Sequence, residues 1–185
     1  MTHRLLLLWL LCWSVPVLAG PKVVVSVAPI HSLVSGVMNG VGEPQLLIPA
    51  GASPHDFALK PSDARALNEA ELIVWVGAGL ENVLDRPIGA LGGNASVVEL
   101  AAVEDVTVLP SREGVDWYKE DEVAKGNHSS AHEHGTIDTH LWLSPGNAVQ
   151  IIHALAGRLS ELDSANAERY QTNANALEKR IKRLS

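Results

Sequence analysis

Short apolar runs alternate with amphipathic patterns along the first half of the chain. The runs are rich in Val, Leu and Ile, as in strands that a parallel sheet buries on both faces, and they cover residues 22–28, 45–48, 71–77 and 96–100. Between them, apolar residues at helical spacing predict helices over residues 30–39, from a cap at Ser62 to residue 70, and over residues 80–91. This alternation predicts an α/β fold in which helices cover both faces of a parallel sheet.

The second half of the chain begins with a polar stretch. Residues 110–138 contain few aliphatic side chains, and we expect them to form a long loop. Ser144 and Pro145 then match a helix N-cap followed by proline in the first turn, and an apolar face continues to Leu162. A last amphipathic pattern reaches the end of the chain without a capping signal, so we expect sequence to be missing beyond it.

The N-terminus has the pattern of a secretory signal peptide. A cationic start is followed by an apolar run from Leu5 to Val15 and by a cleavage pattern that ends at Ala19. The run is shorter than the roughly 20 apolar residues of a transmembrane helix, which favours cleavage of residues 1–19 over anchoring. Cys12 is the single cysteine, and it would leave with the peptide. The mature chain could then hold a metal only through imidazole and carboxylate groups.

The net negative charge of the chain bears on which kinds of molecule it can bind. The full chain carries a formal charge of −7, and loss of residues 1–19, which contain one arginine and no acidic residue, makes it −8. An acidic surface repels phosphate and mildly favours cations, so a nucleic acid partner is not expected. Residues 20–185 are enough for one domain with a hydrophobic core.

Histidines supply the candidate chemistry, because neutral imidazole binds zinc well. His55 follows the second predicted strand in a loop rich in Gly, Ser and Pro, at the edge where open α/β sheets hold ligands. His140 stands at the end of the polar stretch, just before a predicted helix. Each of them, taken alone, is also consistent with a solvated loop histidine. We expect His31, at a helix start, to be structural and His153 to be exposed to solvent.

A denser histidine cluster occurs inside the polar stretch, at His128, His132 and His134. This spacing lets several imidazoles meet at one ion without a fixed fold, although a hydrophilic linker would explain the same residues. Ordering such a segment costs conformational entropy, so we expect low-affinity metal collection here. The principal metal site is expected at His55 and His140.

Three segments together resemble a known protein family. They are residues 51–57 with 60–63, residues 70–77 and residues 140–145, in matching order and spacing. The sequence is similar to the substrate-binding proteins of bacterial ABC importers for zinc and manganese, and specifically to their zinc-uptake (ZnuA-type) branch. The resemblance extends over essentially the whole mature chain, and the combination of segments is far more specific than any one of them.

The resemblance implies an architecture and a metal site. Such proteins have two α/β lobes joined by a long helix, with the metal between the lobes. Their histidines that match His55 and His140 are metal ligands, and a histidine-rich loop before the second one favours zinc over manganese. A third histidine, and often a carboxylate, come from the second lobe. We therefore expect residues 20–160 to form the first lobe, residues 161–185 to begin the linking helix, and the second lobe to be absent.

The function that the resemblance implies is not enzymatic. The protein would be a monomeric periplasmic component that captures Zn²⁺ and delivers it to the membrane permease of an ABC importer. Three alternatives stay open: a stand-alone zinc buffer that uses only the histidine cluster, a manganese-binding relative, and a metallohydrolase with Asp56 or Asp138 as general base. For the metallohydrolase, the sequence contains no His-Glu-x-x-His helix or comparable motif.

Overall fold

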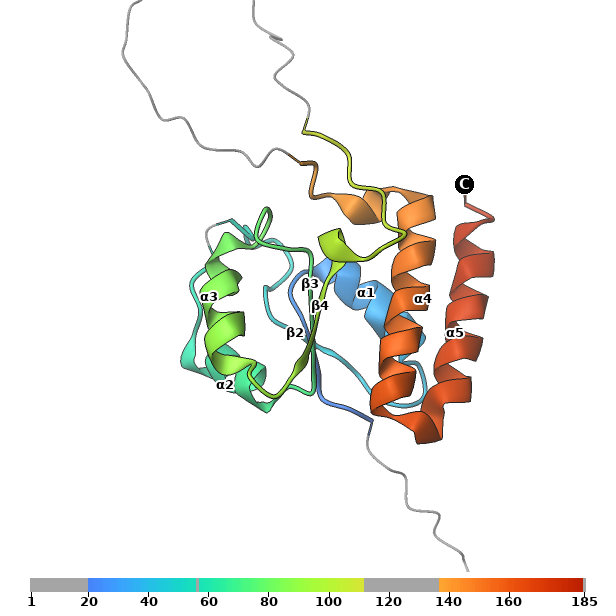
Figure 1. Ribbon diagram of the computed structural model, residues 1–185, viewed down its shortest axis with the longest axis horizontal. Coiled ribbons are helices and arrows are strands. Elements are labelled where there is room, and N and C mark those ends of the chain that lie inside the picture. The colour runs from blue at the N-terminus through green and yellow to red at the C-terminus, as the bar shows by residue number, and fades with distance from the viewer. Residues whose placement is uncertain (1–19, 56, 112–136, 185) are drawn as a thin grey trace, which may run out of the picture.

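Four parallel strands form the centre of the computed structural model, which describes residues 20–55, 57–111 and 137–184 (Figure 1). They are β1 (Val23–Val25), β2 (Gln45–Leu46), β3 (Leu72–Trp75) and β4 (Ser96–Glu99), in the spatial order β2-β1-β3-β4. Val24 lies opposite Gln45 on one side and Ile73 on the other. Because every pair is parallel, the carboxyl ends of the four strands meet at one edge of the sheet.

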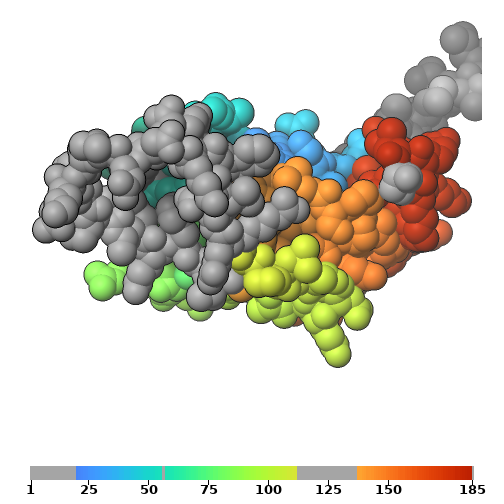
Figure 2. Space-filling model, turned by 90° about the horizontal axis from the view of Figure 1, so that it is seen from above, coloured from blue at the N-terminus to red at the C-terminus, as the bar shows by residue number. Residues whose placement is uncertain are grey.

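Helices cover both faces of the sheet. Within the described residues, α1 (Ala28–Val37), α4 (Pro145–Leu162) and α5 (Ala167–Ile181) lie on one face, and α2 (Pro61–Glu69) and α3 (Asn82–Leu91) lie on the other (Figure 1). Seen from above, α4 and α5 pack side by side (Figure 2). Short 3-10 helices follow at η1 (Leu100–Ala102), η2 (Leu141–Leu143) and η3 (Ser164–Asn166). The predicted α/β fold is therefore confirmed.

The hydrophobic core forms where the apolar runs of the strands meet the helices. Val25 of β1 and Leu72 of β3 are fully buried, and Leu155 of α4 packs with them in the same core cluster. Helix α5 contributes the fully buried ring of Tyr170, whose hydroxyl donates to Asp163 Oδ2 at 2.8 Å. Burial on both faces explains why β1 and β3 lack the alternating polar positions of a half-exposed strand.

Two predicted helix caps had different outcomes. The Ser144 cap is confirmed, because its Oγ accepts a hydrogen bond from Asn147 N at 3.3 Å at the start of α4. The Ser62 cap is wrong, because α2 already begins at Pro61 and its N-cap residue is Lys60. Proline fits the first helical position, and the carboxylate of Asp63 accepts from Lys60 N at 2.9 Å.

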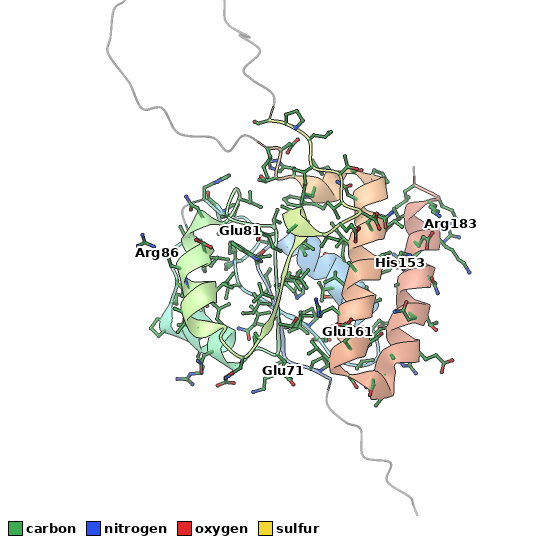
Figure 3. The ribbon with its side chains drawn as sticks, viewed as in Figure 1. Glu71, Glu81, Arg86, His153, Glu161 and Arg183 are labelled. Atoms are coloured by element: carbon green, nitrogen blue, oxygen red, sulfur yellow. The ribbon has the colours of Figure 1, made fainter. Side chains whose placement is uncertain are left out.

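The predicted exposure of His153 is also wrong. Its side chain is only 34% exposed, and its Nε2 lies 2.7 Å from Glu178 Oε2 of α5. Figure 3 shows His153 on α4 at the side that faces α5. The helical pattern of α4 places His153 opposite the core-facing stripe, but α5 returns along this second side and covers it.

Several predictions concern residues that the structure does not describe. They are the signal peptide over residues 1–19, the cluster of His128, His132 and His134, and the side chain of Asp56. Across residues 20–55, 57–111 and 137–184, no helix combines the length and hydropathy needed to span a bilayer.

Candidate metal site

A pocket of about 280 Å³ opens at the carboxyl edge of the sheet. Its walls come from the turn after β1, the loop after β2, the turn after β3 and the segment before α4, and they include Val27, Ile48 and Leu80. His55 and His140, which lie far apart in the sequence, both line this pocket. The rest of the wall is largely apolar, so the two imidazoles are the groups that could bind a metal ion among its described lining residues.

The loop that carries His55 is anchored on both sides of the histidine. Before it, Ile48 is buried and Ala52 N donates to Pro49 O at 3.0 Å, which closes a turn. After it, Phe57 packs against the hydrophobic core. The His55 side chain is exposed, and its ring has no hydrogen-bond partner among the described residues. The backbone is thus held in place, while the imidazole can turn toward an ion.

The segment that carries His140 is fixed more firmly. Asp138 N donates to Leu109 O at 2.8 Å, which joins the segment to the chain that follows β4. Leu141, directly after the histidine, is buried, and its carbonyl oxygen accepts from Asn147 Nδ2 at 3.1 Å. Hydrogen bonds therefore hold the backbone on either side of His140.

The ring of His140 is held but accessible. Asp138 Oδ1 accepts from His140 N at 2.9 Å and lies 3.1 Å from His140 Nδ1. The ring of Trp142 meets the imidazole edge-on, with 5.4 Å between the ring centroids. The His140 side chain nevertheless remains 54% exposed. Sequence reasoning missed Trp142, which also lines the pocket and follows His140 by two residues.

A buried carboxylate joins two of the turns that form the pocket wall. Glu81 is fully buried, and it accepts hydrogen bonds from Ser26 Oγ at 2.5 Å, Gly77 N at 3.0 Å and Val76 N at 3.2 Å. Burial raises the pKa of the Glu81 carboxyl, and these three hydrogen bonds oppose the rise. Figure 3 shows Glu81 at the opposite end of the sheet from Glu71. Sequence reasoning missed Glu81, because an acidic residue at a helix start is usually exposed.

His31 and His153 lie away from the pocket. His31 is structural, as expected: its Nε2 lies 2.9 Å from Pro44 O, and it is not among the pocket residues. His153 contacts α5 instead. Asp138, which we considered as a general base, is a hydrogen-bond partner of His140. Within the described part of the chain, no group of three or more His, Cys, Asp and Glu residues is arranged to hold a metal ion.

Comparisons with known sequences give a consistent result. The model of the family described as "Zinc-uptake complex component A periplasmic" matches residues 23–185. The high-affinity zinc uptake system protein ZnuA of Brucella abortus is 36% identical over 193 residues, which cover 91% of this chain and 58% of that relative. ZnuA of Yersinia pestis is 36% identical over 169 residues, which cover 87% and 52%. The chain thus spans about half the length of the curated relatives it matches.

Solved structures share the fold. Zn(II)-bound AdcA from Streptococcus pneumoniae matches with a TM-score of 0.70 and 19% identity, over 90% of this chain and 31% of that chain. A Mn-bound periplasmic metal binding protein from Candidatus Liberibacter asiaticus matches with a TM-score of 0.66 and 22% identity, over 88% and 53%. By the match over residues 23–185, this chain belongs to the family of the periplasmic component A of zinc-uptake complexes.

Proposed function

We propose that this chain is the zinc-binding component of an ABC import system. It captures Zn²⁺ in the periplasm at His55 and His140 and delivers the ion to a membrane permease. The observation that carries the proposal is that these two histidines line one pocket at the carboxyl edge of the sheet, where open α/β folds bind their ligands. The names of the relatives, which are high-affinity zinc uptake system proteins, support zinc as the cargo.

The donor set of the pocket favours zinc over manganese. Imidazole nitrogen suits zinc, whereas manganese prefers carboxylate, carbonyl and water oxygen. The described residues that line the pocket include two histidines and no carboxylate. Displacement of bound Zn²⁺ by Mn²⁺ should therefore require a large excess of Mn²⁺, and equal competition by the two ions would point to a manganese-binding relative.

Two imidazoles are half of a closed zinc site. Such a site takes four protein donors, or three and a water molecule. We propose that residues 20–160 form one metal-binding lobe, that residues 161–185 correspond to the start of the linking helix of the family, and that further donors come from a second lobe. The span of about half the relatives' length supports this division. The chain by itself is then expected to bind zinc weakly, with water in the remaining positions.

Calorimetric titration of the purified chain with Zn²⁺ tests the proposal. A variant with glutamine at His128, His132 and His134 isolates the pocket, and in this background either His55→Ala or His140→Ala should abolish the remaining one-to-one binding. His153→Gln is the matched control, because it removes an imidazole that contacts α5 and not the pocket. Loss of all binding in the triple variant, with unchanged stoichiometry in the His55→Ala, His140→Ala double variant, would instead identify a zinc buffer that uses only the histidine cluster.

A further inference from the structure

The carboxylate of Asp138 is placed to decide which nitrogen of His140 carries the proton. Its Oδ1 accepts from His140 N at 2.9 Å and lies 3.1 Å from His140 Nδ1. An ionised carboxylate can only accept hydrogen bonds, so Nδ1 must be the donor in the second contact. In neutral imidazole the other nitrogen, Nε2, then keeps its lone pair, which is the electron pair that a metal ion binds.

The backbone around Asp138 keeps this acceptor in place. Asp138 N donates to Leu109 O at 2.8 Å, and Ile137 forms an antiparallel bridge with Pro110. On the other side, Thr139 is buried and lies against Gly79, where an added Cβ atom would come within 3.0 Å of Thr139 Cγ2. The carboxylate is therefore presented by a fixed segment, which precise orientation of a neighbouring ring requires.

The two candidate ligands differ in how far they are arranged in advance. The imidazole of His140 is fixed by Asp138 on one side and restricted by the edge contact with Trp142. The exposed ring of His55 has no such partner within the described part of the chain. A ligand that is already held in its binding geometry loses little conformational entropy when the metal binds. A ring that is free to rotate loses this entropy on binding, which weakens the affinity.

We infer that Asp138 is a positioning residue that keeps metal-free His140 in the Nδ1-protonated tautomer, so that His140 is the prearranged ligand and His55 closes on the ion afterwards. The part of this inference that concerns the ion rests on the proposed function. The tautomer is a property of the metal-free chain, and it can be measured whether or not the pocket binds zinc.

Nuclear magnetic resonance tests the tautomer directly. In two-bond ¹H–¹⁵N spectra of the labelled metal-free chain, at a pH where the imidazoles are neutral, His140 should carry its proton on Nδ1. Asp138→Ala should return His140 to a mixture of tautomers, and Asp85→Ala, which changes an exposed acidic residue of α3, should leave the spectrum of His140 unchanged. A His140 protonated on Nε2 in the unaltered chain, or an unchanged tautomer in Asp138→Ala, would overturn the inference.

Zinc affinity tests the consequence for binding. With the histidine cluster replaced, Asp138→Ala should weaken Zn²⁺ binding roughly 10- to 100-fold, the usual effect of removing a carboxylate that orients a ligand histidine. Asp138→Asn keeps a neutral acceptor and should show a smaller loss. Unchanged affinity in both Asp138 variants would contradict the positioning role.

Discussion

Asn147 holds the turn behind His140, and its replacement by alanine should destabilise the protein. The amide is only 6% exposed and makes three side-chain hydrogen bonds. Its Oδ1 accepts from Thr107 N at 2.9 Å, and its Nδ2 donates to Thr107 O at 2.9 Å and to Leu141 O at 3.1 Å. Each hydrogen bond contributes about 1 kcal/mol net, so the free energy of unfolding should fall by about 3 kcal/mol.

Denaturation by urea in the absence of metal measures this loss. The midpoint should fall while the slope with denaturant stays constant, because the folded state buries nearly the same surface. Asn173→Ala is the matched control: its Nδ2 donates to Val37 O at 2.8 Å and Asn39 O at 2.9 Å, but at a partly exposed position. Water can replace these two bonds, so a loss of about 1 kcal/mol is expected there. An Asn147→Ala variant no less stable than Asn173→Ala would refute the reasoning.

The same pair of variants connects stability with the candidate site. Asn147→Ala removes the side-chain hydrogen bond to the carbonyl of Leu141, the residue that follows His140, whereas Asn173→Ala acts at α5 and at the end of α1. Zinc affinity measured well below the unfolding midpoint should therefore fall in Asn147→Ala and stay unchanged in Asn173→Ala. Equal affinities in the two variants would show that the turn does not need this amide to present His140.

Three further changes have distinct expected outcomes. Gly79→Ala places a Cβ atom 3.0 Å from Thr139 Cγ2, so the segment before His140 must shift by a few tenths of an ångström. Calorimetry should then show weaker zinc binding, and the midpoint of thermal unfolding should change only slightly. Burial raises the pKa of the Glu81 carboxyl above its ordinary value of 4.5, so the folded protein takes up this proton at a higher pH than the unfolded chain does. The stability that this group contributes therefore rises as the pH falls through the raised pKa toward 4.5, and Glu81→Gln should remove that rise in urea midpoints. Tyr170→Phe deletes the 2.8 Å hydrogen bond to Asp163 and should cost about 1.5 kcal/mol by urea denaturation.

Much of the fold could be predicted because the central strands β1 and β3 are buried on both faces. Side chains such as Val25 and Ile73 are buried whichever face they point to, so a continuous apolar run is itself the signal. Local chemistry also identified Ser144 correctly as the N-cap of α4. The errors arose where a second element changes the local pattern. Helix α2 begins at Pro61, before the Ser62 at which we predicted its cap. His153 packs against α5, and no helical pattern within α4 can reveal the contact with a second helix.

The candidate site was predictable in position and less so in detail. His55 and His140 could be placed at the carboxyl edge, because parallel strands bring the loops that follow them to one side of the sheet. The hydrogen bond between Asp138 and His140 depends on side-chain rotamers, which the spacing of two residues does not determine. The buried carboxylate of Glu81 accepts a hydrogen bond from Ser26, which directly follows β1 and is distant in sequence.

The pocket has a consequence for how such a lobe would handle its cargo. In the proposed site, the two imidazoles would hold a zinc ion from one side of the pocket, because the apolar residues around them offer no further strong ligand among those described. The ion would then keep water on its open side, where donors from elsewhere could replace it. Retention would depend on those additional donors, while recognition of zinc would depend on the imidazoles of His55 and His140. Replacing the imidazoles should therefore change which metal ion is selected, whereas replacing the additional donors should change how tightly the ion is bound.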